Sequence, residues 1–256
     1  MASMVPLPPD PNSAAETLTE RVTAILQRDI LSGTLPPDSK LRIQALAARL
    51  DIGTTPIREG LSRLASQGLV QAIGQRGFRV ASVSKADLED ITRTRTLIEV
   101  EALRLSMARG DDLWEAGIVA SLHRMRKFTA RGAGRFREGV ADFDAVHKAF
   151  HTALIAACGS QRLLGLHSAL YDQAYRYRRV MMTRFERPSE LDDEHQILAD
   201  LTLARDTERA ATKLADHLAS TLAIVYPENN KAKEERTNAN VVKGDRRRRA
   251  VGRARR

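Results

Sequence analysis

Apolar residues in the first third of the chain recur at helical spacing. Five of them share one face of a predicted helix that ends at Gly33: Leu18, Val22, Ile25, Leu26 and Ile30. Residues Ile43 to Leu50 predict a second, shorter helix. A third helix is predicted to begin with Thr54 or Thr55 as its N-cap and to end at Gly68.

Two runs of strand-forming residues follow the third helix. They are Val70 to Ile73 and Phe78 to Val83, and residues 74–77 between them predict a hairpin turn. A helix, a turn, a second helix and then a basic hairpin form the layout of a winged helix-turn-helix. Residues 17–84 are therefore predicted to be a DNA-binding domain of three helices and a two-stranded wing.

The rest of the chain has a helical pattern. Breaks at Gly, Pro, Ser and Asp divide it into six helical segments, roughly 85–109, 112–130, 135–158, 161–185, 190–205 and 207–225. Ser84 and Asp87 are suited to cap the first of them. Residues 85–226 thus predict an all-α six-helix bundle, so the fold class is mostly α, with disordered segments at 1–16 and 227–256.

Composition excludes several classes of protein. The 256 residues are 43% hydrophobic and 29% charged, as in an ordinary globular protein, and no stretch is long and apolar enough to span a membrane. Residues 1–16 have neither the basic nor the apolar region of a secretory signal. The single cysteine, Cys158, excludes an intrachain disulfide and a thiolate metal cluster. We expect a cytoplasmic protein.

The net charge of +9 lies mainly near the C-terminal end. Residues 231–256 contain 11 Lys and Arg against three Asp and Glu, whereas residues 17–84 contain nine against five. A basic tail of this composition favours non-specific contacts with DNA phosphates, or is a solvated extension without a specific role. The modest positive charge of residues 17–84 is therefore more informative about function than the larger charge of residues 231–256.

A winged helix-turn-helix inserts the N-terminal end of its recognition helix into the major groove. That geometry brings Thr54, Thr55 and Arg58 close to bases and phosphates, and an arginine there can bind guanine through two hydrogen bonds. The wing would bring Arg76 and Arg79 to the DNA backbone or the minor groove. The alternative is that these are ordinary surface residues of a small helical domain. Three further residues of this domain are candidates for DNA contact: Arg42, Gln44 and Arg63.

Four of the six histidines have an arrangement that suits a metal site. His147 and His151 are four apart on one predicted helix, so their side chains project from the same face. His195 and His217 lie on the last two predicted helices, at a similar depth if these helices are antiparallel neighbours. Imidazoles that converge in a bundle core suit a divalent metal, Zn²⁺ first and otherwise Ni²⁺ or a similar ion. The alternative is that they are ordinary core histidines.

Short motifs in residues 17–84 resemble the GntR family of bacterial transcription regulators. The motifs are Leu31-Ser32-Gly33-Thr34-Leu35-Pro36, Thr55-Pro56-Ile57-Arg58-Glu59-Gly60-Leu61, Gly68-Leu69-Val70 and Arg76-Gly77. The sequence departs from the family pattern where Asp38 replaces a turn glycine, and where Gly53 and Thr54 replace a Ser-Arg pair. The missing arginine commonly contacts DNA in this family, so the resemblance implies a larger role for Arg58.

The second domain resembles the FCD effector-binding domain of FadR-type GntR regulators. The matching motifs are Phe150-His151-Thr152-Ala153-Leu154, Glu194-His195 and Asp216-His217-Leu218. In that domain an aspartate and three histidines typically hold a metal, and the matching positions here are His147, His151, His195 and His217. His147 therefore stands in place of the usual aspartate. Together with Arg176-Tyr177-Arg178, this segment also looks like the branch that includes CsiR-type regulators of dicarboxylate catabolism.

The resemblance also implies an effector pocket beside the metal. A carboxylate can take an open coordination position, and arginines can bind its other end. Arg95 matches an arginine that commonly faces this cavity; Arg176 and Arg178 are further candidates, of which only one can face inward. Each of the three could instead form a surface ion pair or a dimer contact. The expected effector is a small carboxylate or dicarboxylate.

These features predict a ligand-responsive DNA-binding transcriptional regulator. Release of DNA is the commoner response in the family, which favours a repressor, and paired recognition helices predict a homodimer on a palindromic double-stranded operator. One alternative is a metal-dependent enzyme tethered to DNA, but the sequence offers no well-placed general base beside the metal. The other is a non-specific architectural DNA-binding protein, in which the basic tail binds DNA and the bundle serves only for dimerisation.

Overall fold

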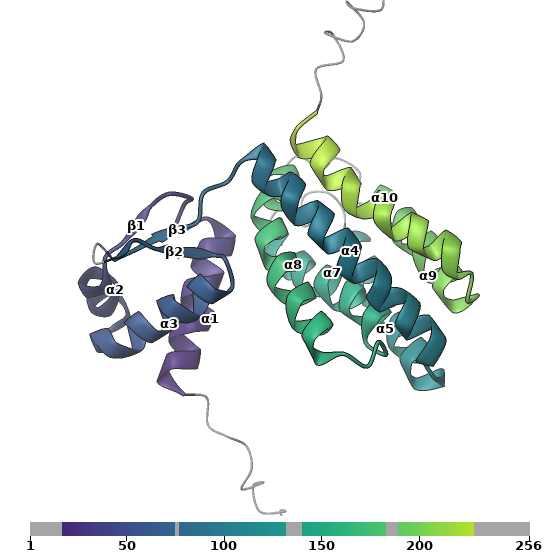
Figure 1. Ribbon diagram of the computed structural model, residues 1–256, viewed down its shortest axis with the longest axis horizontal. Helices are drawn as coiled ribbons and strands as arrows, with labels where there is room; N and C mark the ends of the chain where they lie inside the picture. The colour runs from purple at the N-terminus through teal and green to yellow at the C-terminus, as the bar shows by residue number, and fades with distance from the viewer. Residues whose placement is uncertain (1–16, 75–76, 132–139, 183–188, 228–256) are drawn as a thin grey trace, which may run out of the picture.

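The computed structural model describes residues 17–74, 77–131, 140–182 and 189–227, in two parts that lie side by side (Figure 1). The N-terminal part contains helices and a small sheet. In the described residues the C-terminal part contains helices and their connections alone. The predicted disordered segment 1–16 and the whole basic tail, residues 231–256, lie outside the described residues.

The N-terminal part is a helix-turn-helix with a small antiparallel sheet. Its elements are, in chain order, α1 (Leu18–Ser32), β1 (Lys40–Leu41), α2 (Ile43–Leu50), α3 (Thr54–Ser66), β2 (Val70–Ala72) and β3 (Phe78–Val80). The strand order is β1-β3-β2, with Val70 opposite Val80 and Lys40 opposite Arg79. The prediction of a two-stranded wing is therefore incomplete. A strand of two residues has no alternation of apolar and polar positions from which it could be detected.

Local sequence determines where these elements begin and turn. The N-cap of α3 is Gly53 and not Thr54 or Thr55 as predicted, because both threonines already lie within the first turn of the helix. Asp38, where a turn glycine is usual in the family, adopts a φ of 64°. Aspartate tolerates this left-handed conformation better than most residues, and its carboxylate accepts a hydrogen bond of 2.6 Å from Ser82 Oγ. The turn before β1 thus forms without a glycine.

The C-terminal part is a bundle of long helices. Those described are α4 (Lys85–Arg109), α5 (Asp112–Thr129), α7 (Val140–Ile155), α8 (Gln161–Met182), α9 (Ser189–Leu203) and α10 (Thr207–Val225). Each corresponds to one of the six predicted segments. Ser84 caps α4 as predicted, because its hydroxyl accepts a hydrogen bond of 3.1 Å from the Asp87 amide. The mostly α fold class is confirmed.

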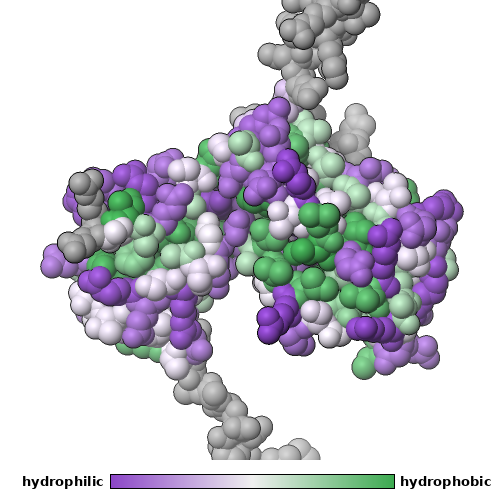
Figure 2. Space-filling model, in the orientation of Figure 1, coloured by the Kyte–Doolittle hydropathy of each residue, from purple (hydrophilic) through white to green (hydrophobic). Residues whose placement is uncertain are grey.

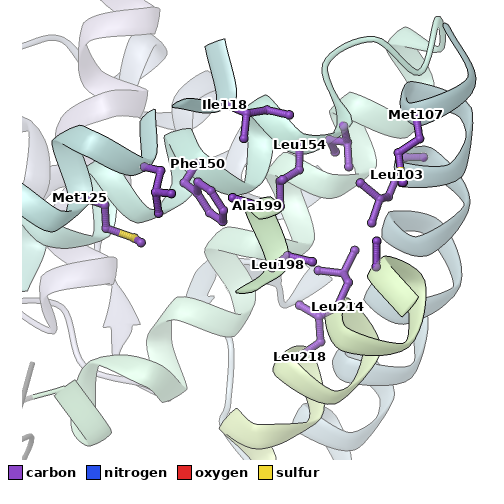
Figure 3. Close-up of a cluster of buried hydrophobic side chains, with 14 of the residues drawn as sticks. Leu103, Met107, Ile118, Met125, Phe150, Leu154, Leu198, Ala199, Leu214 and Leu218 are labelled. Atoms are coloured by element: carbon purple, nitrogen blue, oxygen red, sulfur yellow. The ribbon is translucent and has the colours of Figure 1, made fainter. Parts of the chain in front are cut away.

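Each part has its own hydrophobic core. In the N-terminal part, the buried side chains include Leu26 of α1 and Ile57 of α3. In the bundle, Leu103 of α4, Phe150 of α7 and Leu198 of α9 belong to a second core that α5 and α10 complete (Figure 3). The buried residues of each core belong to one part, and the partly buried Leu31 of α1 packs against both cores.

Helix α8 lies on the side of the bundle that faces the N-terminal part (Figure 1). The two parts are joined there by polar contacts. Gln173 Nε2 donates to the backbone carbonyl of Gln67 at 2.8 Å, and Gln27 Nε2 donates to Asp172 Oδ2 at 2.8 Å. A displacement of α8 would therefore reach both α1 and the end of α3.

An apolar area is exposed on the bundle (Figure 2). Leu97 of α4 is 70% exposed, and it lines a shallow groove with Val100 of α4 and with Ala211 and Ala215 of α10. We refer to these four residues as the α4–α10 face. None of the described helices has the length and apolar character needed to cross a membrane.

Candidate metal centre and DNA-binding surface

Five of the predicted DNA-contacting residues lie at the starts of α2 and α3. Arg42 precedes α2 as its N-cap residue, and Gln44 lies in the first turn. Thr54 and Thr55 begin α3, and Arg58 follows one turn later. All five are exposed to solvent. The N-terminal turn of a recognition helix is the part that enters the major groove, so Thr54, Thr55 and Arg58 of α3 have the position expected for base contacts. Arg42 and Gln44 belong to the first helix of the pair, which in this layout crosses the DNA backbone.

The other predicted DNA contacts have different surroundings. Arg63 is exposed on α3. Arg79 of β3 is partly buried and donates a hydrogen bond from Nη1 to the backbone carbonyl of Asp38. Arg76 lies outside the described residues. Lys40, which the sequence pattern did not indicate, is exposed on β1 opposite Arg79 and adds positive charge to the wing.

Four histidines from three helices converge inside the bundle. We call them the histidine cluster: His147 and His151 of α7, His195 of α9 and His217 of α10. One ring nitrogen from each lies within 4.8 Å of those of the other three. The Nε2 atoms of His147 and His195 are 2.9 Å apart. Two nitrogens bound to one zinc ion stand roughly 3.3 Å apart, so the donors are close enough to share an ion after small adjustments.

Helical spacing and core packing produce this convergence. Residues four apart share a helix face, so both α7 histidines point into the bundle. His195 lies three residues before the buried Leu198, and His217 lies three residues after the buried Leu214. The apolar residues that fix the rotation of α9 and α10 therefore also direct these two imidazoles inward.

Burial favours the neutral form of these imidazoles. Desolvation, followed by the charges of His195 and Arg178, lowers the pKa of His147 well below its ordinary value. Burial lowers the pKa of His151 in the same way. It also lowers the pKa of His217, although a hydrogen bond to Glu194 opposes that shift. A neutral imidazole offers the nitrogen lone pair that metal coordination requires.

His151 is the clearest indication that the cluster suits a cation. Both of its ring nitrogens are buried, and neither has a hydrogen-bond partner within the part of the chain that the structure describes. An unsatisfied buried polar group costs roughly 1–3 kcal/mol, which a bound ion would remove. Four imidazole nitrogens form a donor set that suits Zn²⁺, Ni²⁺ and similar ions.

Sequence reasoning missed a polar network behind His147. Tyr171 Oη of α8 lies 2.5 Å from His147 Nδ1 and 3.0 Å from Asp144 Oδ1. Arg178 Nη2 donates to the same Asp144 oxygen at 2.9 Å. Burial raises the pKa of Tyr171 well above its ordinary value, so its hydroxyl keeps its proton. Asp144 precedes His147 by one helical turn, which is a usable signal, whereas the part played by Tyr171 depends on how α7 and α8 pack.

Two of the predicted effector arginines lie beside the histidine cluster. Arg95 is buried on α4 and pairs with Glu99, with 2.7 Å between Nε and Oε1. Its guanidinium carbon lies 5.3 Å from the centre of the Tyr171 ring. That of Arg178, also buried, lies 4.3 Å from the same ring. Each arginine already pairs with a carboxylate of the protein.

Arg176 faces the linker between the two parts and not the histidine cluster. Its Nη1 donates to the backbone carbonyl of Ala81 at 2.8 Å, and its Nη2 lies 3.7 Å from Asp87 Oδ2. Residues two apart on a helix point about 200° apart, so Arg176 and Arg178 project from opposite sides of α8. The expectation that Arg176 contacts an effector is therefore corrected to a contact with the linker, and Arg178 is the inward arginine.

Glu99 connects Arg95 to His167, a buried histidine outside the histidine cluster. His167 Nδ1 lies 3.1 Å from Glu99 Oε1, and His167 Nε2 lies 3.3 Å from Thr152 Oγ1. Burial acts to raise the pKa of Glu99, but the charge of Arg95 and the neighbouring His167 outweigh it and lower the pKa to about 2. Glu99 therefore stays ionised at neutral pH and holds Arg95 in place.

Comparison with known proteins assigns both parts of the chain. Residues 18–80 match the model of bacterial regulatory proteins of the gntR family, and residues 90–220 match the FCD domain. The HTH-type transcriptional repressor GlaR of Escherichia coli strain K12 is 39% identical over 204 residues, which cover 78% of this chain and 92% of GlaR. The HTH-type transcriptional regulator BphR of Paraburkholderia xenovorans strain LB400 is 37% identical over 220 residues, covering 85% and 89%.

Solved structures share the fold. McbR/YncC of Escherichia coli superimposes with a TM-score of 0.68 at 24% identity, covering 84% of this chain and 99% of that one. A GntR transcriptional regulator from Rhodococcus sp. RHA1 gives a TM-score of 0.64 at 24% identity, covering 82% and 98%. The family and these relatives are transcription regulators and not enzymes, which removes the enzyme alternative. The chain belongs to the GntR family of DNA-binding transcriptional regulators and contains its FCD domain.

Proposed function

We propose that this chain is a repressor that binds a palindromic operator as a homodimer and releases it when the bundle binds a small carboxylate. The observation that carries the proposal is the histidine cluster, with two buried arginines, Arg95 and Arg178, beside it. GlaR, which is 39% identical, is named a repressor. Residues 17–84 would form the DNA-binding domain and residues 85–226 the domain for effector binding and dimerisation.

The histidine cluster would hold a divalent metal, with zinc as the first candidate. Its four nitrogens lie within 4.8 Å of one another, and burial favours the neutral imidazoles that zinc binds. When bound, such an ion would supply a positive charge and, as a fifth coordination position beyond the four imidazoles, a place where a carboxylate oxygen can bind. The unpartnered nitrogens of His151 support this assignment over a purely structural role for the cluster.

Arg95 and Arg178 would bind the far end of the effector. A guanidinium can bind a carboxylate through two parallel hydrogen bonds. Two arginines beside one metal favour a ligand with two negative groups, that is, a dicarboxylate. Because Glu99 and Asp144 already pair with these arginines, an incoming carboxylate must share or replace those internal partners.

Helix α8 would transmit the binding event to the DNA-binding domain. Tyr171 and Arg178 lie on its inward side, next to the cluster. Gln173 and Arg176 lie on its outward side and hydrogen-bond to backbone carbonyls of Gln67 and Ala81. A small rotation or shift of a rigid helix moves both sets of contacts together. Effector binding would therefore change how the two recognition helices of a dimer are placed.

The proposal is tested by measuring the affinity of the protein for operator DNA while zinc and the dicarboxylate are each added or left out. An operator is first selected from random DNA with the full chain and then labelled for fluorescence anisotropy. Affinity is compared for metal-free protein, zinc-loaded protein, and zinc-loaded protein with unbranched dicarboxylates of increasing length. We expect one acid to weaken binding by roughly 5–150-fold, and only in the zinc-loaded protein.

His151→Ala is the control for this experiment, since it removes one donor of the cluster and lies far from the DNA-contacting residues. We expect this variant to bind the operator, with an affinity that does not change when the acid is added. The proposal fails if no acid changes the affinity of zinc-loaded protein. Selection that yields no preferred sequence, with affinity falling steeply as salt rises, would support the architectural alternative.

A further inference from the structure

A buried chain of hydrogen bonds reaches from a carboxylate to the ring of His147. Tyr171 Oη lies 2.5 Å from His147 Nδ1, 3.0 Å from Asp144 Oδ1 and 3.4 Å from the backbone oxygen of Asp144. The exposed fraction is 7% for Asp144 and 0% for Tyr171. In a site this dry, each of these hydrogen bonds is stronger than it would be in water.

The direction of each hydrogen bond follows from the groups involved. The Asp144 carboxylate, paired with Arg178 Nη2 at 2.9 Å, accepts. Tyr171 has one hydroxyl hydrogen, which it donates to Asp144, so its oxygen accepts from the Nδ1–H of His147. In that tautomer Nε2 of His147 has no hydrogen, and it lies 2.9 Å from Nε2 of His195. The chain of hydrogen bonds therefore turns the lone pair of His147 toward the histidine cluster.

We propose that Tyr171 and Asp144 are positioning residues for the metal: they fix His147 in the tautomer that binds through Nε2 and strengthen it as a ligand. This inference rests on the proposed metal-binding function and extends it to two residues that are not ligands. A metal-bound imidazole almost always donates its second N–H to a hydrogen-bond partner of this kind. Loss of the partner typically weakens metal binding about 10–100-fold. Asp144 adds, across one hydroxyl group, a negative charge that four neutral imidazoles lack.

A merely structural role for Tyr171 makes a different prediction. Its ring contacts Arg95 and Arg178 at 5.3 Å and 4.3 Å, and those contacts persist when only the hydroxyl is removed. Tyr171→Phe therefore separates the hydroxyl from the ring. Tyr175→Phe is a matched control, because Tyr175 is buried one turn further along α8, and its ring lies 5.8 Å from Arg178. Its hydroxyl is not part of the chain that reaches His147.

Two measurements on the full-length protein test the inference. Competition with a chromophoric chelator gives the zinc affinity of the wild type, Tyr171→Phe and Tyr175→Phe. We expect Tyr171→Phe to bind zinc about 10–100-fold more weakly and Tyr175→Phe to match the wild type. Nitrogen NMR of labelled histidine in metal-free protein should show Nδ1–H at His147 in the wild type and lose that preference in Tyr171→Phe.

Each outcome decides the matter. Weaker zinc binding in Tyr171→Phe, with wild-type binding in Tyr175→Phe, supports the inference, and the same direction of change in Asp144→Asn strengthens it. Wild-type affinity and an unchanged tautomer in Tyr171→Phe overturn the inference and leave the proposed metal binding intact. Equal weakening in both tyrosine variants indicates general damage to the bundle and also overturns it. A wild type that does not bind zinc overturns the inference together with the metal function.

Discussion

Glu99 is a fully buried carboxylate that remains ionised because Arg95 lies one helical turn before it on α4. Their Nε and Oε1 atoms are 2.7 Å apart, and both side chains are almost completely removed from water. A buried ion pair of this kind is costly to break, because removing one partner leaves the other charge uncompensated. Glu99 thus determines how Arg95 is presented beside the histidine cluster.

The ion pair predicts how stability depends on pH. The folded-state pKa of Glu99 is lowered from 4.5 to about 2, so its contribution is complete above pH 4.5 and is lost as the pH falls toward 2. Glu99→Gln should therefore lower the free energy of unfolding by about 3 kcal/mol at pH 7, with the difference from the wild type shrinking between pH 4.5 and pH 2. Urea unfolding followed by circular dichroism measures both quantities.

Glu101→Gln is the matched control, because Glu101 lies two residues away on the same helix and is exposed. The free energy of unfolding of Glu101→Gln should differ little from that of the wild type at any pH. A difference between Glu99→Gln and the wild type that stays constant down to pH 2 would show that the charge of Glu99 is not the cause.

At the scale of elements, α8 makes polar contacts on two opposite sides. Its inward side supplies Tyr171 and Arg178 to the cluster, and its outward side supplies Arg176 to the linker between the two parts. A helix with contacts at both places is a physical route between the proposed effector site and the DNA-binding domain. A variant on the outward side of α8 tests this route, because it should change the coupling between the two sites.

Arg176→Ala provides that test. The variant loses the hydrogen bond to the Ala81 carbonyl and the contact with Asp87 but leaves the histidine cluster unchanged. Zinc affinity should therefore match the wild type, while the ratio of operator affinities with and without the effector should move toward one. Both are measured on the same protein, by chelator competition and by fluorescence anisotropy.

Arg162→Ala serves as the comparison, since Arg162 is exposed near the start of the same helix. It should keep the wild-type ratio. An unchanged ratio in Arg176→Ala would exclude this contact as the route between the two sites.

The elements also show what sequence alone can predict. The helix of residues 85–109 was predicted with its observed bounds because Ser84 caps it and Gly110 follows it. The histidine cluster was predictable because the spacing of His147 and His151 and the resemblance to the FCD domain point to the same four residues. The strand β1 was too short to give a pattern. The contact of Tyr171 with His147 depends on the relative rotation of α7 and α8, which the sequence of neither helix encodes by itself.

At the scale of the whole molecule, the α4–α10 face is a groove with an apolar centre, in which Ala211 is buried and Val100 and Ala215 are partly exposed. Polar side chains also line this groove: Thr96, Glu101, Arg104 and Thr212. Leu97 is 70% exposed there, beside Val100, Ala211 and Ala215. An exposed apolar patch on a soluble domain often marks a contact between proteins. GntR regulators usually act as dimers, so a second copy of this chain is the partner that we propose for this face.

Leu97→Glu should therefore weaken the dimer, because it places a charge where apolar surfaces would meet. Sedimentation velocity over a range of protein concentrations should show the variant dissociating at concentrations where the wild type remains dimeric. Leu113→Glu is the control, since Leu113 of α5 is 80% exposed but lies outside the α4–α10 face. If Leu97→Glu and the wild type sediment alike, the dimer interface lies elsewhere.

The chemistry of the histidine cluster has a consequence for the cell in which the protein works. Its four donors are imidazole nitrogens, with no oxygen ligand among them. Mg²⁺ and Ca²⁺ bind oxygen and shed water for nitrogen only reluctantly, so the abundant divalent ions of a cell are poor competitors for such a site. On the proposed function, the protein would respond to its organic acid only when a scarcer, nitrogen-binding metal is also present. The repressor would then combine two signals, the supply of a carbon compound and the supply of a trace element, in one decision about transcription.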